Sequence, residues 1–155
     1  MLVISQASSL VEIEEVRQLF AEYESTLGLD LCFQGFKDEL ASLPGAYGPP
    51  SGSLLLARVD RDAAGCVGLR KLEDEICEMK RLYVKRDFRR FGLGRTLVNT
   101  LIENACAAGY RYMRLDTHPE RMGSAVRLYE TLGFRPIKPY YNNPHEGVLF
   151  MELEL

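Results

Sequence analysis

Apolar residues in the first third of the chain follow helical spacing. They recur at positions 13, 16, 19, 20 and 23, so we expect a helix over residues 10–23 with one buried face. Residues 2–4 have the character of a short strand, and residues 36–43 that of a second, short helix. A segment rich in Gly and Pro, residues 43–52, then predicts a loop.

The middle of the chain changes to strand character. Residues 53–59 and 66–72 are apolar runs of strand length, and the polar segment 60–65 between them is typical of a hairpin connection. Residues 76–84 follow as a third strand. The next apolar stripe has helical spacing again and ends near Gly109, a residue type that commonly stops helices. Its members are Leu93, Leu97, Val98, Leu101, Ile102 and Ala105.

The last third predicts two strands with a helix between them. Residues 112–117 form the first strand, and residues 148–155 alternate in polarity as the second. Gly133 stops the helix, whose apolar stripe consists of Ala125, Leu128, Tyr129 and Leu132. The predicted order, β-α-α-β-β-β-α-β-α-β, is that of an α/β (or α+β) fold with helices packed on a mixed sheet. Residues 1–155 are expected to form a single domain.

The composition is that of a soluble globular protein, but the charge is unevenly distributed. Hydrophobic residues make up 46% of the chain, and the formal net charge is -3. Between residues 80 and 95, however, seven basic residues stand against one acid. This local excess favours a bound anion. The negative total charge and the lack of an aromatic-rich RNA motif argue against nucleic-acid binding.

The cysteines and the start of the chain indicate where the protein resides. Cys32, Cys66, Cys77 and Cys106 show no CxxC pair and no zinc-ligand spacing, so we expect free thiols and no bound metal. The first ten residues lack the basic start and long apolar run of a signal peptide. No apolar stretch approaches the roughly 20 residues that span a bilayer. We therefore expect a cytoplasmic protein that does not contact membranes.

One segment between a predicted strand and a predicted helix has the chemistry of a phosphate site. It consists of Arg89, Arg90, Phe91, Gly92, Leu93, Gly94, Arg95 and Thr96. Glycines let the backbone approach a pyrophosphate, free N–H groups at a helix start bind it, and arginines add charge-assisted hydrogen bonds. The GxGxxG pattern fails because position 97 is Leu, and the P-loop pattern is absent. A tight turn flanked by solvated arginines is the alternative.

The spacing Arg89-x-x-Gly92-x-Gly94 resembles the acetyl-CoA motif of the GNAT N-acetyltransferase superfamily. The resemblance continues upstream in residues 82–84 and downstream in residues 125–134, which match the family's A-x-x-L-Y-x-x-x-G-F segment. It implies a mixed sheet of about six or seven strands with about four helices. It also implies acetyl-CoA as cosubstrate and a primary amine that attacks it directly in a ternary complex. Met122 stands where many members carry Asn, so that side-chain contact to the cofactor is not expected here.

The resemblance also assigns roles to individual residues. Backbone groups of Leu82, Tyr83 and Val84 would bind the pantetheine arm, with the N–H near Leu82 stabilising the oxyanion. Glu78 matches a position that often holds the general base, and an ion pair with Lys80 or Arg81 is the alternative. In a regular strand Glu78, Lys80, Leu82 and Val84 would share one face.

Tyr129 falls on the family's tyrosine position and would protonate the leaving thiolate. A phenol with an ordinary pKa of about 10 holds its proton at neutral pH. A core tyrosine with no catalytic part is the alternative.

The resemblance places the acceptor between the N-terminal helices and the loop before the last strand. Acidic and aromatic residues in these segments suit a cationic amine. They include Tyr23, Glu24, Tyr47, Tyr140, Tyr141, Asn142 and Glu146. The alternative function is a catalytically silent acyl-CoA-binding module that senses the cofactor or regulates a partner. The sequence leaves a homodimer open.

Overall fold

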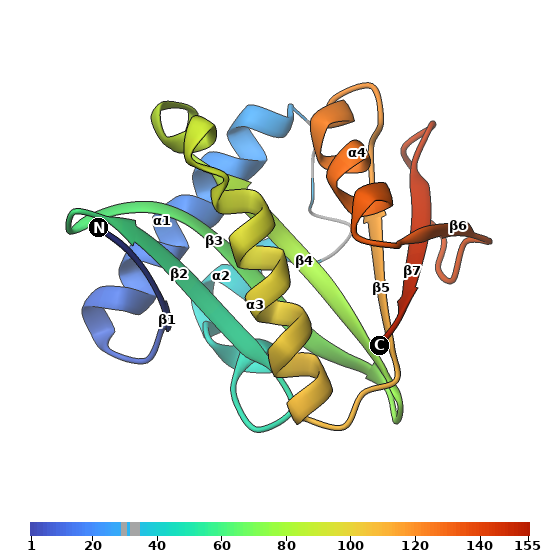
Figure 1. The fold of residues 1–155 in the computed structure, drawn as a ribbon, viewed down its shortest axis with the longest axis horizontal. Helices are drawn as coiled ribbons and strands as arrows, with labels where there is room; N and C mark the ends of the chain where they lie inside the picture. Colours follow the sequence, from blue (N-terminus) through green and yellow to red (C-terminus); the bar gives the residue numbers. More distant parts are fainter. Residues whose placement is uncertain (29–30, 32–34) are drawn as a thin grey trace.

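The computed structural model describes residues 1–28, 31 and 35–155. Seven strands form one sheet in the order β1-β2-β3-β4-β5-β7-β6 (Figure 1). The strands are β1 (Leu2–Gln6), β2 (Ser53–Val59), β3 (Asp62–Glu73), β4 (Ile76–Val84), β5 (Tyr112–Thr117), β6 (Arg135–Ile137) and β7 (Leu149–Glu154). The helices are α1 (Leu10–Leu27), α2 (Phe36–Ser42), α3 (Leu93–Ala107) and α4 (Gly123–Thr131), with short 3-10 helices η2 (Gly45–Tyr47) and η3 (Arg86–Phe91).

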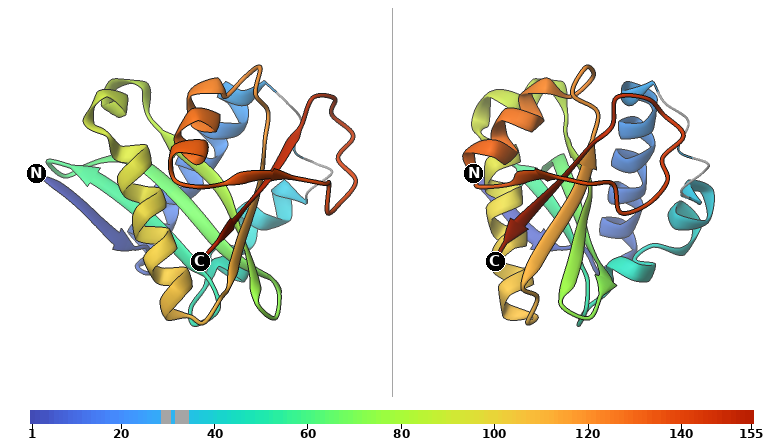
Figure 2. Two further views of the ribbon diagram at one scale, coloured as in Figure 1. Left: turned by 45° about the vertical axis from the view of Figure 1, so that its right-hand side comes forward. Right: turned by 90° about the vertical axis from the view of Figure 1, so that its right-hand side faces the viewer.

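The sheet lies between two helical layers. Helices α1 and α2 cover one face, and α3 and α4 cover the other (Figures 1 and 2). Two apolar clusters follow this division: one contains Leu97, Leu101 and Tyr129 with the sheet side chains facing α3 and α4. The other contains Leu19 and Phe20 with the side chains facing α1 and α2. Because β4 and β5 are parallel and their other neighbours antiparallel, the predicted mixed sheet is confirmed.

Helix α1 is longer than the sequence predicts, because its ends are well capped. At its start, the Ser9 hydroxyl accepts from the Glu12 amide and the Glu12 carboxylate accepts from the Ser9 amide, a reciprocal capping box. At its end, Gly28 takes a left-handed conformation (φ 70°), which closes the last turn after Leu27 rather than Tyr23. The extra turn brings Thr26 and Leu27 to the cavity described below.

Two strand assignments differ from the sequence prediction. Strand β3 begins at Asp62 instead of residue 66, because Asp60 and Arg61 alone form the turn, both at positive φ. Strand β6 is not predicted at all. Its three residues include Pro136, and so short a segment shows no alternation. It pairs with β7 at the edge of the sheet.

Strand β4 contains a β-bulge that changes which of its side chains share a face. Arg81 has a φ of 63°, and the pairing with β3 shifts between Cys66 and Gly68 at this point. Beyond the bulge Leu82 and Val84 pack with the α3 cluster, whereas Tyr83 joins the α1 cluster. The expected common face of Glu78, Lys80, Leu82 and Val84 is therefore wrong, because one extra residue reverses the alternation.

Strands β4 and β5 separate near the middle of the sheet. Their parallel pairing comprises three residue pairs and ends with Glu78 opposite Arg114. Beyond that point no strand among the described residues pairs with the second half of β4 on this side, so its backbone faces a gap rather than a ladder. Figure 1 shows the two strands diverging toward the end of the sheet where α3 and α4 begin.

The described chain shows neither a membrane-spanning helix nor a metal-ligand cluster. Its helices lack the length and hydrophobicity that a bilayer crossing requires, and no three His, Cys, Asp or Glu among the described residues are placed to hold a metal ion. Cys66, Cys77 and Cys106 are free thiols, the first two buried. Cys32 lies outside the described residues.

Candidate active site

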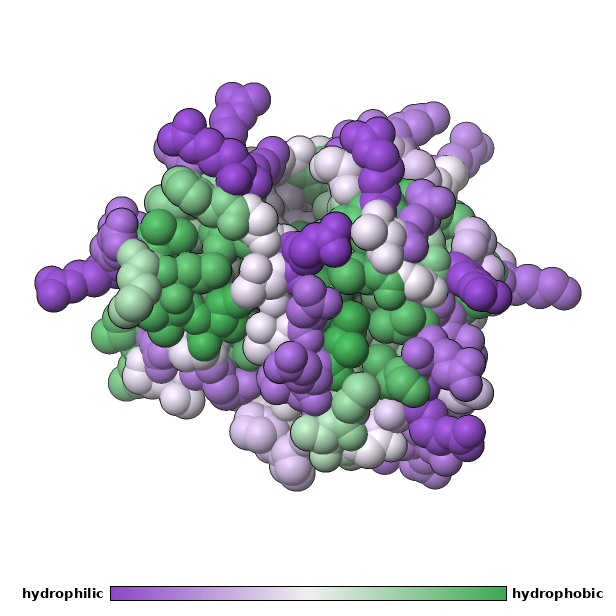
Figure 3. All heavy atoms as spheres, in the orientation of Figure 1, coloured by the Kyte–Doolittle hydropathy of each residue, from purple (hydrophilic) through white to green (hydrophobic). Residues whose placement is uncertain are grey.

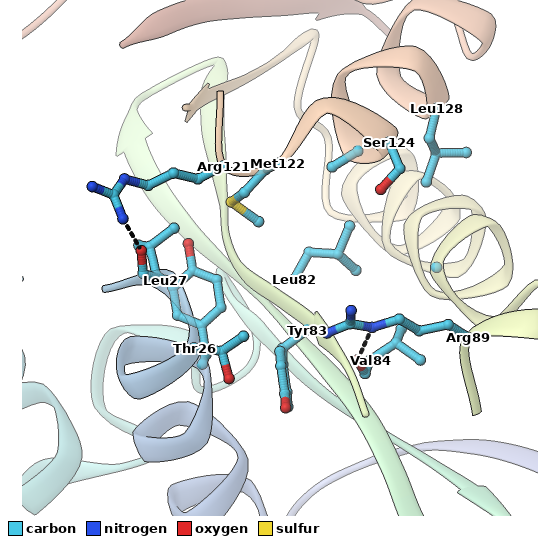
Figure 4. A pocket seen from close by; sticks show the side chains of 13 residues that line it. Thr26, Leu27, Leu82, Tyr83, Val84, Arg89, Arg121, Met122, Ser124 and Leu128 are labelled. Atoms are coloured by element: carbon cyan, nitrogen blue, oxygen red, sulfur yellow. Dashed lines mark hydrogen bonds between the residues drawn. The ribbon is translucent and has the colours of Figure 1, made fainter. Parts of the chain in front are cut away.

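A cavity of about 280 Å³ opens where β4 and β5 have separated. In the space-filling view the surface is hollowed between the start of α3 and α4 (Figure 3). Residues from β4, η3, α3, α4 and the last turn of α1 surround it (Figure 4). The lining residues are Tyr23, Thr26, Leu27, Leu82, Tyr83, Val84, Arg89, Gly94, Arg121, Met122, Ser124, Ala125 and Leu128.

The turn into α3 presents free amides at one end of this cavity. Gly92 caps the helix in a left-handed conformation (φ 69°), which glycine adopts without strain. The first helical bond runs from the Thr96 amide to the Gly92 carbonyl (3.2 Å). The amides of Leu93, Gly94 and Arg95 therefore precede the helical ladder and point out of the helix start. Such amides, together with the helix dipole, attract a phosphate.

The predicted phosphate-binding residues divide into two groups in the structure. Arg89 and Gly94 line the cavity, and Arg89 also donates from Nε to the Val84 carbonyl (2.9 Å). The others do not line it. The Leu93 side chain is fully buried, the Thr96 hydroxyl donates to the Gly92 carbonyl, and Gly92 and Arg95 are exposed. Arg90 stacks over the exposed ring of Phe91.

The pantetheine candidates lie along the part of β4 that has separated from β5. Leu82, Tyr83 and Val84 all line the cavity, and beyond the bulge at Arg81 Tyr83 and Val84 still pair with β3, so the edge that faced β5 is the free one. A free strand edge of this kind can hydrogen-bond an extended ligand as an added strand would.

Several lining residues were not predicted, and most come from α1 and α4. Arg121 donates from Nη1 to the Leu27 carbonyl (2.9 Å), which joins the start of α4 to the end of α1 (Figure 4). The positive φ of Gly28 (70°) favours glycine here, and a Cβ at this position would lie 2.9 Å from that nitrogen and displace the end of the Arg121 side chain. Met122 and Tyr23 line this cavity and the two smaller cavities next to it.

Tyr129 lies in the smaller cavity between the separated strands. It shares this lining with Leu82 and Asp116 among others, and its ring packs against Phe134. Burial raises the pKa of Tyr129, with the carboxylate of Asp116 acting in the same direction. The phenol is therefore held in its protonated form at neutral pH, as a proton donor must be.

Glu78 is a buried carboxylate with fixed partners. Its side chain is 1% exposed. Arg70 donates to Oε1 from Nε (2.8 Å), and the Tyr140 hydroxyl donates to Oε2 (2.6 Å). Arg70, from β3, is thus the ion-pair partner in place of Lys80 or Arg81. Arg81 instead forms a bidentate pair with Glu39 at 2.9 Å.

A third cavity, of about 40 Å³, lies on the α1 side of the sheet. The end of β5 and the loop before β7 contribute Asp116, Thr117, His118, Asn143, His145 and Val148, and β4 contributes Arg81. Of the seven acceptor residues expected from the sequence, Tyr23 is the one in this lining. Tyr47, however, is buried in the core against Phe20.

Comparison with known proteins identifies the family. The model of the acetyltransferase (GNAT) family matches residues 13–134. The chain belongs to the GNAT acetyltransferase family. An uncharacterized N-acetyltransferase of Schizosaccharomyces pombe is 41% identical, over 93% of this chain and 89% of that protein. The family resemblance of the sequence is thereby confirmed, and the chain is an acyl-CoA-dependent acetyltransferase.

Solved GNAT structures share the fold of this chain. An acetyltransferase of Staphylococcus aureus superposes with a TM-score of 0.82 at 20% identity, covering 99% of both chains. A GNAT acetyltransferase of Elizabethkingia anophelis with acetyl-CoA bound superposes with a TM-score of 0.58 at 25% identity, over 68% of this chain and 77% of that one.

The GNAT site fits acetyl-CoA in its chemistry. The three amides that precede the first helical hydrogen bond of α3 can donate to a diphosphate. Gly94 has no side chain that would occupy that end of the cavity. A Cβ on Gly94 would meet only Leu128, at 3.6 Å. The unpaired edge of β4 then leads from this end toward Leu82 and Tyr129.

Proposed function

We propose that this GNAT acetyltransferase moves an acetyl group from acetyl-CoA to a primary amine, which attacks the thioester directly in a ternary complex. The supporting observation is the separation of β4 and β5 after Glu78 and Arg114. Beyond it lies a large cavity, which has the amide-bearing turn into α3 at one end. A small polar cavity lies on the α1 side. Because both share Tyr23 and Met122 in their linings, two substrates can be bound next to each other.

Acetyl-CoA would supply an activated thioester, held by the amides of residues 93–95, by Arg89 and by the β4 edge. The Leu82 amide, beside the bulge, would donate to the carbonyl oxygen as negative charge develops on it. The Tyr129 hydroxyl would give its proton to the leaving sulfur. Burial supports this role, because it raises the Tyr129 pKa and keeps the proton in place until a thiolate forms.

Glu78 is our candidate for the final proton acceptor. Its carboxylate is screened from the cavities by the bonds with Arg70 and Tyr140. Because Tyr140 lines none of the three cavities, a proton from the amine would have to reach its hydroxyl through water, and the hydroxyl would pass its own proton to Glu78 as it accepts another. Burial raises the pKa of Tyr140, and Glu78 acts in the same direction, so the phenol is protonated at the start of the cycle.

Release of CoA thiol tests the proposal. The full chain would be mixed with acetyl-CoA and a panel of primary amines, and the free thiol titrated against time. We expect thiol release that depends on the amine, together with an acetylated product of matching mass. Calorimetric binding of acetyl-CoA with no release for any amine would contradict transfer and favour the silent binding module. No binding of acetyl-CoA, and no competition by adenosine 3′,5′-bisphosphate, would contradict the cofactor assignment as well.

A further inference from the structure

We propose that Asp116 recognises the acceptor by binding its protonated amino group on the α1 side of the sheet. The inference rests on the proposed function and adds a substrate class to it. That class is a small amine that enters as a cation and carries no acidic group next to its nitrogen.

Asp116 stands between the two substrate sites. It lies on β5 two residues beyond Arg114, where the pairing with β4 ends. Its side chain lines the cavity on the α1 side and also the cavity that contains Leu82 and Tyr129. An amine bound to this carboxylate would therefore be next to the position proposed for the thioester.

The carboxylate of Asp116 is held through one of its two oxygens. The Tyr141 hydroxyl donates to Oδ2, and Asn143 Nδ2 lies 3.4 Å from the same atom. Asn143 also donates to the Tyr141 oxygen (2.9 Å) and accepts from the His145 amide (2.9 Å). No described residue donates a hydrogen bond to Oδ1. Tyr141 and Asn143 thus position Asp116 and leave one oxygen for a ligand.

The charges around this cavity favour a cation. Asp116 is its one acidic lining residue among those the structure describes, and Arg81 its one arginine. Arg81 is neutralised by its bidentate bonds to Glu39, a pair that lowers the Glu39 pKa although burial alone would raise it. Lys80, from β4, is the cation that competes for Asp116. Burial and Arg81 together lower the Lys80 pKa to about 8, so this competition fades just above neutral pH.

Two buried polar atoms in the same lining point to a polar ligand. Thr117 Oγ1 and His118 Nδ1 have no hydrogen-bond partner among the described residues. The Thr117 residue is 6% exposed, so its hydroxyl is screened from bulk solvent. Leaving such a group unsatisfied is costly, and a ligand with hydrogen-bonding capacity would relieve that cost.

Direct binding tests the inference without requiring turnover. The full chain, uniformly labelled with ¹⁵N and saturated with CoA, would be titrated at pH 7 with n-butylamine, a cation, and with n-butanol, its neutral analogue. We expect amide shifts in residues 116–118, 143 and 145–148, with the amine binding at least tenfold more tightly than the alcohol. In Asp116→Asn, which keeps the shape of the side chain, that preference should disappear.

Glu120→Gln is the matched control, because it removes one exposed negative charge near the end of β5 without touching a cavity. The preference for the amine should persist in this variant. Equal binding of amine and alcohol to the wild type, or an unchanged preference in Asp116→Asn, would overturn the inference.

Kinetics separate recognition from proton transfer. With a turned-over amine, Asp116→Asn should raise the KM for the amine at least tenfold and change kcat less than threefold. A loss of kcat at unchanged KM would contradict a binding role. If the wild type bound n-butylamine through Asp116 yet acetylated no amine, the proposed function would fail while the recognition site stood.

Discussion

The Tyr140 hydroxyl donates a 2.6 Å hydrogen bond to Glu78, the last residue of β4 that pairs with β5. The next residue, Tyr141, donates in the same way to Asp116 on β5. Both tyrosine rings pack edge-on against Phe150 of β7. One loop thus holds a carboxylate on each of the two strands where they separate. The two carboxylates, one fully buried and one half-buried, can therefore take different parts in the same reaction.

Removing the Glu78 charge should slow the chemical step. We expect Glu78→Gln to lower kcat by about 100-fold or more, the usual contribution of a positioned proton acceptor. Tyr140→Phe should act in the same direction, because it removes the hydroxyl through which we propose that the proton travels, and should cost about 1–3 kcal/mol of stability by leaving Oε2 without its donor. The measurements are steady-state kinetics at saturating acetyl-CoA and urea denaturation.

Glu75→Gln provides the control, since Glu75 lies exposed just before β4 and its carboxylate pairs with the exposed Arg111. It should leave kcat unchanged. A folded Glu78→Gln protein with the wild-type kcat and pH profile would show that the amine proton leaves by another route.

Tyr129→Phe should separate turnover from cofactor binding. Without the hydroxyl the thiolate leaves unprotonated, so kcat should fall by about 100-fold. The affinity for acetyl-CoA should change less than threefold, because the ring still fills its place against Phe134. Tyr112→Phe, on a half-buried tyrosine that lines none of the three cavities, should alter neither quantity. Turnover of Tyr129→Phe at the wild-type rate would reject the acid role.

The sequence predicted the frame of the site because that part depends on local patterns. Helical spacing identified α1, α3 and α4, and the glycines at 92 and 94 indicated the amide-bearing turn between β4 and α3. Both features follow from residues close together in the chain. The choice of Leu82, Tyr83 and Val84 came from family resemblance, and all three line the cavity.

The rest depends on contacts between distant segments. The bulge at Arg81 cannot be recognised from the local sequence, because a positive φ usually marks a glycine and this residue is an arginine. Its side chain is bound by Glu39 from α2, a residue distant in the chain. The Arg70 partner of Glu78 comes from β3, and Tyr140 from a loop 62 residues away. The sequence pattern places Asp116 only within a strand. Its surroundings come from distant segments, because Tyr141 and Asn143 bind its carboxylate and the end of α1 lines the same cavity.

Gly94→Ala should weaken cofactor binding without weakening the fold. The added Cβ meets Leu128 at an ordinary 3.6 Å, so the helix tolerates it. Alanine is the better helix former by up to about 1 kcal/mol, and the unfolding free energy should stay equal or rise. The methyl group enters the cavity, however, where it would keep a diphosphate from the α3 amides. We expect the calorimetric Kd for acetyl-CoA to rise at least tenfold.

Gly123→Ala is the control for this change, since Gly123 begins α4, lines none of the three cavities and has open space at its Cβ position. It should leave the Kd unchanged. Equal affinity in Gly94→Ala would mean that the phosphates bind elsewhere.

The pH dependence of stability should report the burial of Lys80. Its pKa is about 8 in the folded chain, against an ordinary 10.5, mainly because burial disfavours the charged form. Protonated Lys80 therefore opposes folding below pH 8, and this opposition fades as the pH rises toward 10.5, because the unfolded chain then binds more protons than the folded one. Between pH 7 and 9.5 the unfolding free energy of the wild type should rise by about 2 kcal/mol relative to Lys80→Met. Urea denaturation of both proteins at the two pH values measures this difference.

Lys37→Met, on an exposed lysine of α2, should show no such change relative to the wild type. A constant difference between the wild type and Lys80→Met would mean that Lys80 titrates as it does in the unfolded chain, and that its charge competes for Asp116 throughout this range.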